Sequence, residues 1–95
     1  MSDRETVLER LRDVHSFPGP YLFKAIGPNT PDFVAAVLQA VINIAGPEAT
    51  PEIQTRESGQ GNHQSVTVTV TLNRAEQVLD VYEVLNNVHG VRYVF

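Results

Sequence analysis

The chain has 95 residues, no cysteine and a formal net charge of −4. This length suits one domain with its own core, and the lack of cysteine excludes disulfides, thiolate metal sites and thiol nucleophiles. The few basic residues are spread along the chain without a basic patch, so we expect no nucleic-acid partner. The charged N-terminus does not resemble a signal peptide, and the longest apolar stretch, 33–45, is too short to span a bilayer. We therefore expect a cytoplasmic protein without a membrane partner.

The first predicted element is a short helix over residues 2–14. Ser2 is suited to cap this helix, and Glu5 three positions later completes a capping box. Its apolar residues fall on one face, namely Val7, Leu8, Leu11 and Val14. A stretch rich in proline then ends it. We expect residues 1–16 to be a helical appendage packed on the edge of a single domain, 17–95, with a partner-binding helix as the alternative.

A strand, a turn and a longer helix follow. Residues 21–26 alternate in the manner of a strand, with Lys24 on the face that we expect to stay open. The turn 27–32 leads into a helix, for which Thr30 is well placed as N-cap and Pro31 as the first helical residue. Apolar residues then recur at helical spacing up to Gly46-Pro47, which ends the helix.

The second half of the chain begins with a predicted hairpin. Residues 51–57 form a strand with Ile53 as its main apolar residue, which is typical of a sheet edge. The glycine-rich segment 58–63 forms the hairpin loop. Residues 65–72 then alternate valine and threonine at period two, and both types favour the extended conformation. This pattern predicts a strand in the interior of the sheet.

A second helix and a last strand complete the chain. Asn73 as cap and Glu76 three residues later indicate the start of the helix. Its expected apolar stripe comprises Ala75, Val78, Leu79, Tyr82, Leu85 and Val88. We expect His89-Gly90 to end this helix, with the histidine beside the negative end of the helix dipole, and residues 91–95 to form the last strand.

This order of elements predicts an α+β fold, the ferredoxin-like split βαββαβ sandwich. Right-handed crossovers give a four-stranded antiparallel sheet in the order 4-1-3-2, with two helices on one face plus an extra N-terminal helix. The helices would cover the face that carries Tyr21, Phe23, Ala25, Val66, Val68 and Val70. The other face would carry Lys24 among threonines, and the N-terminal helix, a second subunit or solvent are the alternatives for what covers it.

Several motifs resemble those of one protein family. They are Phe17-Pro18-x-Pro20-x-x-x-Lys24-x-Ile26-Gly27, Ser58-x-x-Gly61-Asn62-x-x-Ser65-Val66, Glu76-Gln77-Val78, Tyr82 and Val91-Arg92. Together they resemble the YbeD family of small bacterial proteins of unknown function, over nearly the whole chain from residue 17. The resemblance implies a ferredoxin-like fold related to ACT-type regulatory domains, with no established activity. Family members commonly carry a lysine and an aromatic residue where this chain has Gln60 and His63, which weakens a basic, anion-holding role for the hairpin.

The turn 27–32 is the first candidate ligand site. Its candidate residues are Gly27, Asn29, Thr30 and Asp32. In ACT-like domains, the corresponding turn helps to hold small effectors such as amino acids, and the free N–H groups of a helix start suit a carboxylate. A well-capped helix start is the alternative interpretation, since Thr30 would satisfy one N–H and Asp32 adds a negative charge.

The hairpin and the open sheet face are further candidates. Gly61, Asn62 and His63 could form a backbone nest for an anion, although such loops are more often simple turns. Lys24, near the threonines and Arg92, either binds an anionic ligand or partner or only shields apolar neighbours with its stem.

No motif indicates catalysis. The three histidines lie in distant segments without metal-ligand spacing, and the threonines lack a base. We therefore expect no enzyme, no catalytic or metal site and no cofactor. The favoured hypothesis is an ACT-like regulatory or adaptor domain that acts through an unknown protein partner or a small anionic or amino-acid effector. The alternatives are a self-associating structural module, such as a homodimer, and, less favoured, a sheet face that binds nucleic acid.

Overall fold

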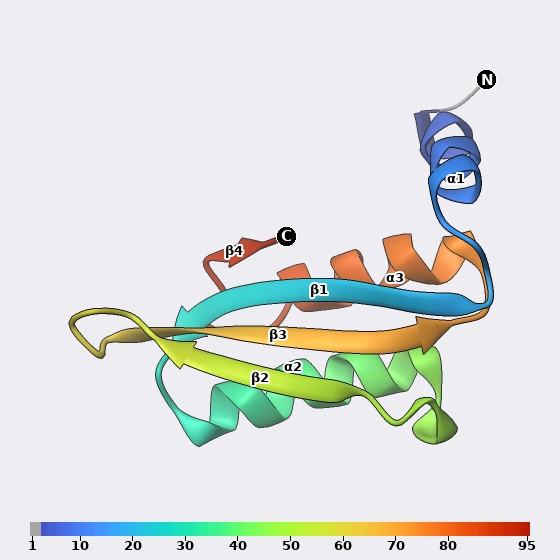
Figure 1. The fold of residues 1–95 in the computed structure, drawn as a ribbon. Coiled ribbons are helices and arrows are strands. Elements are labelled where there is room, and N and C mark those ends of the chain that lie inside the picture. Colours follow the sequence, from blue (N-terminus) through green and yellow to red (C-terminus); the bar gives the residue numbers. More distant parts are fainter. Residues whose placement is uncertain (1–2) are drawn as a thin grey trace.

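The computed structural model describes residues 3–95. Its elements are α1 (Asp3–Val14), β1 (Gly19–Pro28), α2 (Pro31–Ala45), the short 3-10 helix η1 (Pro47–Ala49), β2 (Glu52–Glu57), β3 (His63–Leu72), α3 (Ala75–Asn86) and β4 (Tyr93–Val94). The predicted cap at Ser2 lies outside the described residues. Figure 1 shows α2 and α3 behind one face of the sheet and α1 standing out at one end.

The sheet has the predicted topology. Its strand order is β2-β3-β1-β4, and each neighbouring pair is antiparallel. The strand of alternating valine and threonine, β3, lies in the interior and pairs with β1 along its whole length, from Gly19 opposite Leu72 to Pro28 opposite His63. The two crossovers run through α2 and α3. The ferredoxin-like α+β fold is therefore confirmed, although β4 is shorter than the predicted strand 91–95.

The core lies between the sheet and the two helices. Phe23 and Ala25 of β1 and Val66, Val68 and Val70 of β3 are all buried. They pack against Val37 and Val41 of α2 and against Val78, Val81 and Leu85 of α3. Strict alternation on both central strands places these side chains on one face. The predicted division into a core face and an open face is confirmed.

Helix α2 begins and ends as predicted. The Thr30 hydroxyl accepts a hydrogen bond from the Phe33 N–H at 3.2 Å, and Pro31 is the first helical residue. At the other end, Gly46 has a φ of 94° and its N–H donates to the Ile42 carbonyl at 2.8 Å. A positive φ of this kind favours glycine, which explains why the helix stops there.

Helix α3 differs from the prediction at both ends. It begins at Ala75 with Arg74 as N-cap, so the predicted cap at Asn73 is wrong. The Gln77 carbonyl oxygen supplies the cap by accepting from the N–H groups of Asn73, at 2.7 Å, and Arg74, at 3.2 Å. A buried glutamine that reaches back to the preceding backbone replaces the predicted side-chain cap.

The predicted helix end at His89-Gly90 is also wrong, because α3 ends at Asn86. The chain turns there so that the Arg92 N–H can donate to the Ile26 carbonyl at 2.7 Å and align β4 beside β1. Gly90, with a φ of 86°, lies within this turn. The predicted stripe also omitted Val81, which is fully buried, and it included Val88, which packs on the core from beyond the helix.

Helix α1 packs against α3 rather than on the open sheet face. Leu8 is buried and Leu11 packs on the core, whereas Val14 is 76% exposed and therefore does not belong to the packed face. Aromatic contacts continue from the end of α1 into the core. The His15 ring lies 4.8 Å from that of Tyr21, and Tyr21 lies 4.9 Å from Phe23. The segment after α1 is thereby anchored to β1.

Candidate functional site

The turn 27–32 and the hairpin loop 58–63, two separate candidates in the sequence, lie side by side. The Asn29 side-chain amide donates to the Gly61 carbonyl at 2.9 Å, and the Asn29 backbone N–H donates to the Asn62 carbonyl at 3.3 Å. Behind them, the amide of the buried Gln64 donates to the carbonyls of Pro28 and Thr30. The two loops therefore form one hydrogen-bonded unit at the end of the sheet.

Most polar groups of the turn 27–32 serve the fold. Thr30 caps α2, and Asp32 is exposed in the first turn of that helix. Gly27 is buried, and a Cβ there would lie 2.4 Å from the Phe33 ring, so close packing explains this glycine. Of the four candidate residues in this turn, only Asn29 forms hydrogen bonds with the hairpin loop.

Lys24 and His63 meet in a depression beside the hairpin, which we call the hairpin hollow. It has a volume of about 300 Å³ and is lined by Lys24, Ile26, Arg56, Glu57, Ser58, His63, Gln64 and Ser65. Lys24 and Arg56 form no side-chain hydrogen bond or ion pair with any of residues 3–95. Two cationic groups are therefore available there, with the Glu57 carboxylate as the opposing charge.

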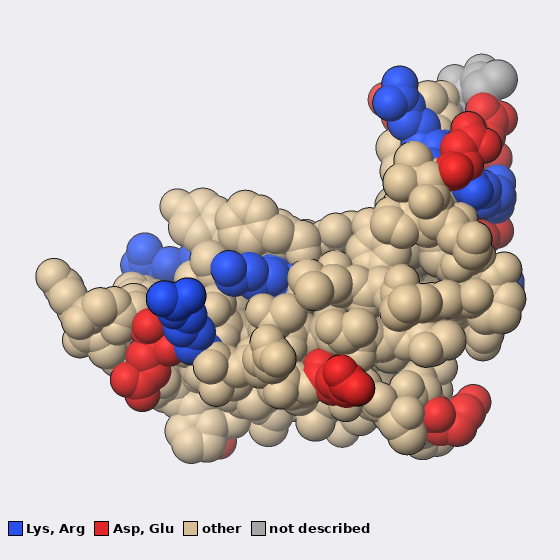
Figure 2. Space-filling model, viewed as in Figure 1, with Lys and Arg blue, Asp and Glu red and all other residues tan. Residues whose placement is uncertain are grey.

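A second, larger depression continues along the open sheet face and shares Lys24, Arg56 and Ser65 with the hairpin hollow. We call it the strand hollow; its volume is about 540 Å³, and Gln54, Thr55 and Thr67 complete its lining. Figure 2 shows Lys and Arg side chains gathered over the hairpin end of this face and acidic side chains along its β2 side. The open face is thus electrostatically polarised.

Sequence reasoning missed Arg56, Ser58 and Ser65 as site residues. Arg92, which was expected near Lys24, lines neither hollow. Strand register explains why Arg56 and Ser65 line the hollows together with Lys24. Arg56 lies opposite Ser65 in the β2–β3 pair, and Lys24 lies opposite Thr67 in the β1–β3 pair. The alternation of β2 was the available signal, since it places Gln54 and Arg56 on the same face as Lys24.

The open face also carries large apolar side chains. Tyr93 lies opposite Ile26, and the backbone groups of Phe95 bond to those of Lys24. The two aromatic rings stack with their centroids 6.4 Å apart, and Tyr93 is 61% exposed and Phe95 60% exposed. Leu22 on β1 is 56% exposed. Exposed apolar groups on one face are typical of an interaction surface.

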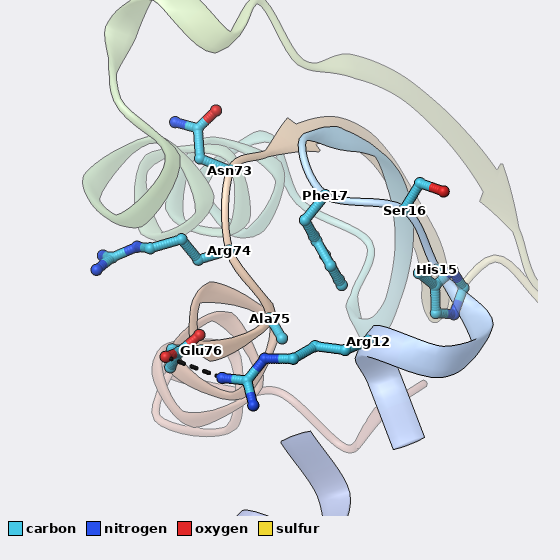
Figure 3. Close-up of a pocket in the computed structure, with 8 residues that line it drawn as sticks. All are labelled: Arg12, His15, Ser16, Phe17, Asn73, Arg74, Ala75 and Glu76. Carbon is cyan, nitrogen blue, oxygen red and sulfur yellow. Dashed lines mark hydrogen bonds and ion pairs between the residues drawn. The ribbon is translucent and has the colours of Figure 1, made fainter. Parts of the chain in front are cut away.

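A separate cleft lies between α1 and the start of α3. It has a volume of about 580 Å³ and is lined by Arg12, His15, Ser16, Phe17, Asn73, Arg74, Ala75 and Glu76. Figure 3 shows Arg12 reaching across to Glu76 while the side chain of Arg74 extends away from that pair. This cleft depends on how α1 docks, which no motif in the sequence specifies.

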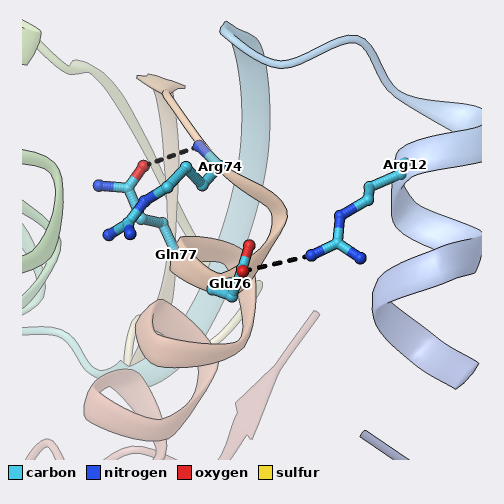
Figure 4. A network of polar contacts seen from close by, with 4 residues as sticks. All are labelled: Arg12, Arg74, Glu76 and Gln77. Carbon is cyan, nitrogen blue, oxygen red and sulfur yellow. Dashed lines mark hydrogen bonds and ion pairs between the residues drawn. The ribbon is translucent and has the colours of Figure 1, made fainter. Parts of the chain in front are cut away.

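The ion pair in this cleft joins α1 to α3. Arg12 Nη2 lies 3.2 Å from Glu76 Oε2, and Figure 4 shows this pair next to the Gln77 cap. The pKa of Glu76 is lowered, first by its hydrogen bond to its own backbone N–H and then by the charges of Arg12 and Arg74, against an opposing effect of desolvation. Tyr82 of α3 is partly buried against the core, and this burial together with the Tyr21 hydroxyl raises the pKa of Tyr82 to about 12.

The lowered pKa of Glu76 predicts that α1 docks less firmly in acid. A carboxyl whose folded pKa is depressed stabilises the fold fully above its unfolded pKa, and this contribution is lost as the pH falls through the folded pKa. We therefore expect the protection factors of the α1 amides, which correct for the slower intrinsic exchange in acid, to fall below the ordinary pKa range of glutamate. Exchange measured over an acid pH series checks this, with Glu76→Gln as control. If the α1 amides of the Glu76→Gln variant lost protection equally at low pH, Glu76 would not be the cause of the effect.

No helix within residues 3–95 combines the length and the apolar character needed to cross a membrane. In the same part of the chain, no three His, Asp or Glu side chains come together in an arrangement that could hold a metal ion.

The architecture and the two hollows define the class of protein: a small ferredoxin-like α+β domain with an open sheet face. Residues 12–95 match the family model described as "Protein of unknown function (DUF493)". A UPF0250 protein from Yersinia enterocolitica is 35% identical over 85 residues, covering 90% of this chain and 95% of that protein. UPF0250 protein YbeD from Salmonella arizonae is 33% identical with the same coverage. The chain therefore belongs to the YbeD (UPF0250, DUF493) family, as the sequence motifs predicted.

Two solved structures share the fold at low sequence identity. The solution structure of protein HP0495 from H. pylori has a TM-score of 0.66 and 11% identity, with 85% of each chain covered. The C-terminal domain of the MgtC protein from Mycobacterium tuberculosis has a TM-score of 0.60 and 15% identity, with 85% of this chain and 87% of that chain covered. At such identities the likeness extends to the fold alone.

Proposed function

We propose that this protein is a non-catalytic, ACT-like regulatory domain of the bacterial cytoplasm that binds a small anionic effector in the hairpin hollow. One observation supports the proposal above the others. Lys24 and Arg56, unpaired with any of residues 3–95, both line a hollow that the hairpin closes on one side. The volume of about 300 Å³ lies at the lower end of the range for small-molecule sites.

The lining chemistry suits a carboxylate with a second polar group. The ammonium of Lys24 and the guanidinium of Arg56 would hold the carboxylate. The guanidinium has two parallel N–H donors that match the two carboxylate oxygens. The hydroxyls of Ser58 and Ser65 and the imidazole of His63 add hydrogen-bonding groups. Glu57 on the rim would accept from an ammonium group. An amino acid carries both charges and is therefore the effector class that we favour.

A titration followed by two-dimensional amide NMR tests the proposal. Amino acids and small carboxylates are added one at a time, and a binder should shift the amides of the hairpin 58–63 and of β1 around Lys24. Shifts confined to the cleft between α1 and α3 would instead place the anion beside Arg12. A panel that leaves all amides unchanged would overturn effector binding of this class.

Replacing Lys24 gives a sharper prediction. Lys24→Ala should leave the free energy of unfolding within about 0.5 kcal/mol of the wild type, because the side chain is exposed and unpaired within residues 3–95. The same variant should weaken binding of any effector found by the titration about tenfold, since it removes one of two cations. Arg10→Ala on α1 changes the net charge equally and should bind normally. A loss of stability above about 2 kcal/mol would mean that Lys24 supports the fold.

A self-associating structural module is the second candidate. The exposed Leu22, Tyr93 and Phe95 on the open face and the free outer edge of β2 favour it. In that case the hollows would have no ligand, and the protein would act through a protein interface alone.

A further inference from the structure

Strand β2 is an edge strand with one unused side. It pairs with β3 from Glu52 to Glu57 and has no strand neighbour on its other side within residues 3–95. Its register is continuous, and it contains neither proline nor a bulge. Figure 1 shows this strand along the rim of the sheet. Unpaired N–H and C=O groups along such a rim are a template for another strand.

Symmetry restricts how two copies of β2 could pair. A two-fold axis perpendicular to the sheet makes the strands antiparallel and keeps the open face of each copy on the same side. Directly opposed residues must then lie on the same face, so their numbers differ by an even number. The central residue of the pairing is therefore Ile53, Gln54 or Thr55.

The charges of β2 select one of these three registers. With Gln54 at the centre, Glu52 lies opposite Arg56 of the second copy, and the same pair forms again by symmetry. Directly opposed unlike charges stabilise a strand pair. A centre at Thr55 places Ile53 opposite the Glu57 carboxylate, and a centre at Ile53 brings Pro51 into the pairing. The register with Gln54 at its centre, which we call the Gln54 register, is the one that places Glu52 opposite Arg56 and keeps Pro51 out of the pairing.

We infer that the outer edge of β2 pairs with β2 of a second copy of this chain in the Gln54 register, forming a continuous eight-stranded sheet. Pairing over residues 52–56 buries less than the roughly 1,200–2,000 Å² of a stable interface, so the dimer is weak and depends on concentration. The outer edge of β2 carries this inference, which does not rest on effector binding. Arg56 takes part in both the pairing and the lining of the hairpin hollow, whereas Glu52 takes part only in the pairing, so a Glu52 variant separates the two.

Charge reversal tests the pairing. In Glu52→Arg, both unlike pairs become like pairs, and self-association should weaken by roughly tenfold or more. Arg56→Glu should have the same effect. The double variant Glu52→Arg with Arg56→Glu restores both pairs in swapped form and should associate as the wild type does. Sedimentation and NMR relaxation from micromolar to millimolar concentration measure the association, and dimer formation should shift the amides of 52–57.

The controls separate this dimer from other causes. Glu83→Arg, on the exposed side of α3, changes the net charge as Glu52→Arg does and should leave association unchanged. Because Glu52 does not line the hairpin hollow, Glu52→Arg should also leave any effector binding there intact. A wild type that remains monomeric at millimolar concentration overturns the inference. So does a dimer that both single variants leave intact, because it would use another surface, such as the Tyr93–Phe95 face.

Discussion

Val68→Asp is expected to abolish cooperative folding. Val68 is fully buried at the centre of β3, opposite Phe23 on one side and Ile53 on the other. An aspartate there loses the packed isopropyl group and buries a carboxylate without a partner, which together cost more than about 4 kcal/mol. The total free energy of unfolding of a small domain is only about 5–15 kcal/mol. Thermal melts followed by circular dichroism should therefore lose their sigmoidal transition.

The neighbouring position provides the control. Thr67 lies on the open face, opposite Lys24 and Gln54. Thr67→Asp introduces the same carboxylate one residue away, where water and a nearby cation can solvate it, so it should melt within a few degrees of the wild type. If both variants melted alike, the assignment of the two faces of β3 would be wrong.

Gln77→Leu should give the second largest loss of stability, about 2–3 kcal/mol. Gln77 is a buried polar residue whose side chain forms hydrogen bonds with three backbone groups in two segments of the chain. Its carbonyl oxygen caps the N–H groups before α3, and its amide donates to the Ile44 carbonyl near the end of α2 at 3.2 Å. A leucine fills the space but leaves these backbone groups without their partner. Urea denaturation measures the difference.

Asn73→Ala is the matched control for this cap. Asn73 is the residue that the capping pattern favours, yet its exposed side chain forms no hydrogen bond with residues 3–95. Its removal should change the free energy of unfolding by less than about 0.5 kcal/mol, whereas loss of a true N-cap costs about 1 kcal/mol. If Asn73→Ala lost more stability than Gln77→Leu, Asn73 rather than Gln77 would be the residue that caps the helix.

Local sequence patterns predicted the strands and the topology because they describe the immediate surroundings of each residue. The alternating valine and threonine residues of β3 specify one buried and one more solvated face, independently of the rest of the chain. The polar composition of β2 marks it as an edge, and the right-handed crossover rule then leaves one sheet order. Thr30 and Gly46 act within their own helix, so their roles as caps could be predicted from the sequence.

The candidate site was predicted only in part. Lys24 and His63 were identified, but their meeting with Arg56 requires the register of two strand pairs at once. The contact of Asn29 with Gly61 joins residues 32 positions apart and has no local signal. The docking of α1 through Arg12 and Glu76 is likewise a long-range event between exposed charges.

The sequence alone determined the secondary-structure order, the face of each central strand and the family of this protein, because alternation, capping and motifs are short-range properties. The tertiary structure decided where helix α3 begins and ends, since a buried glutamine and the path to β4 override the local cap signals. It also decided which charges meet on the open face. Strand pairing brings distant residues within reach of one another, and that register is a property of the whole sheet rather than of any one segment.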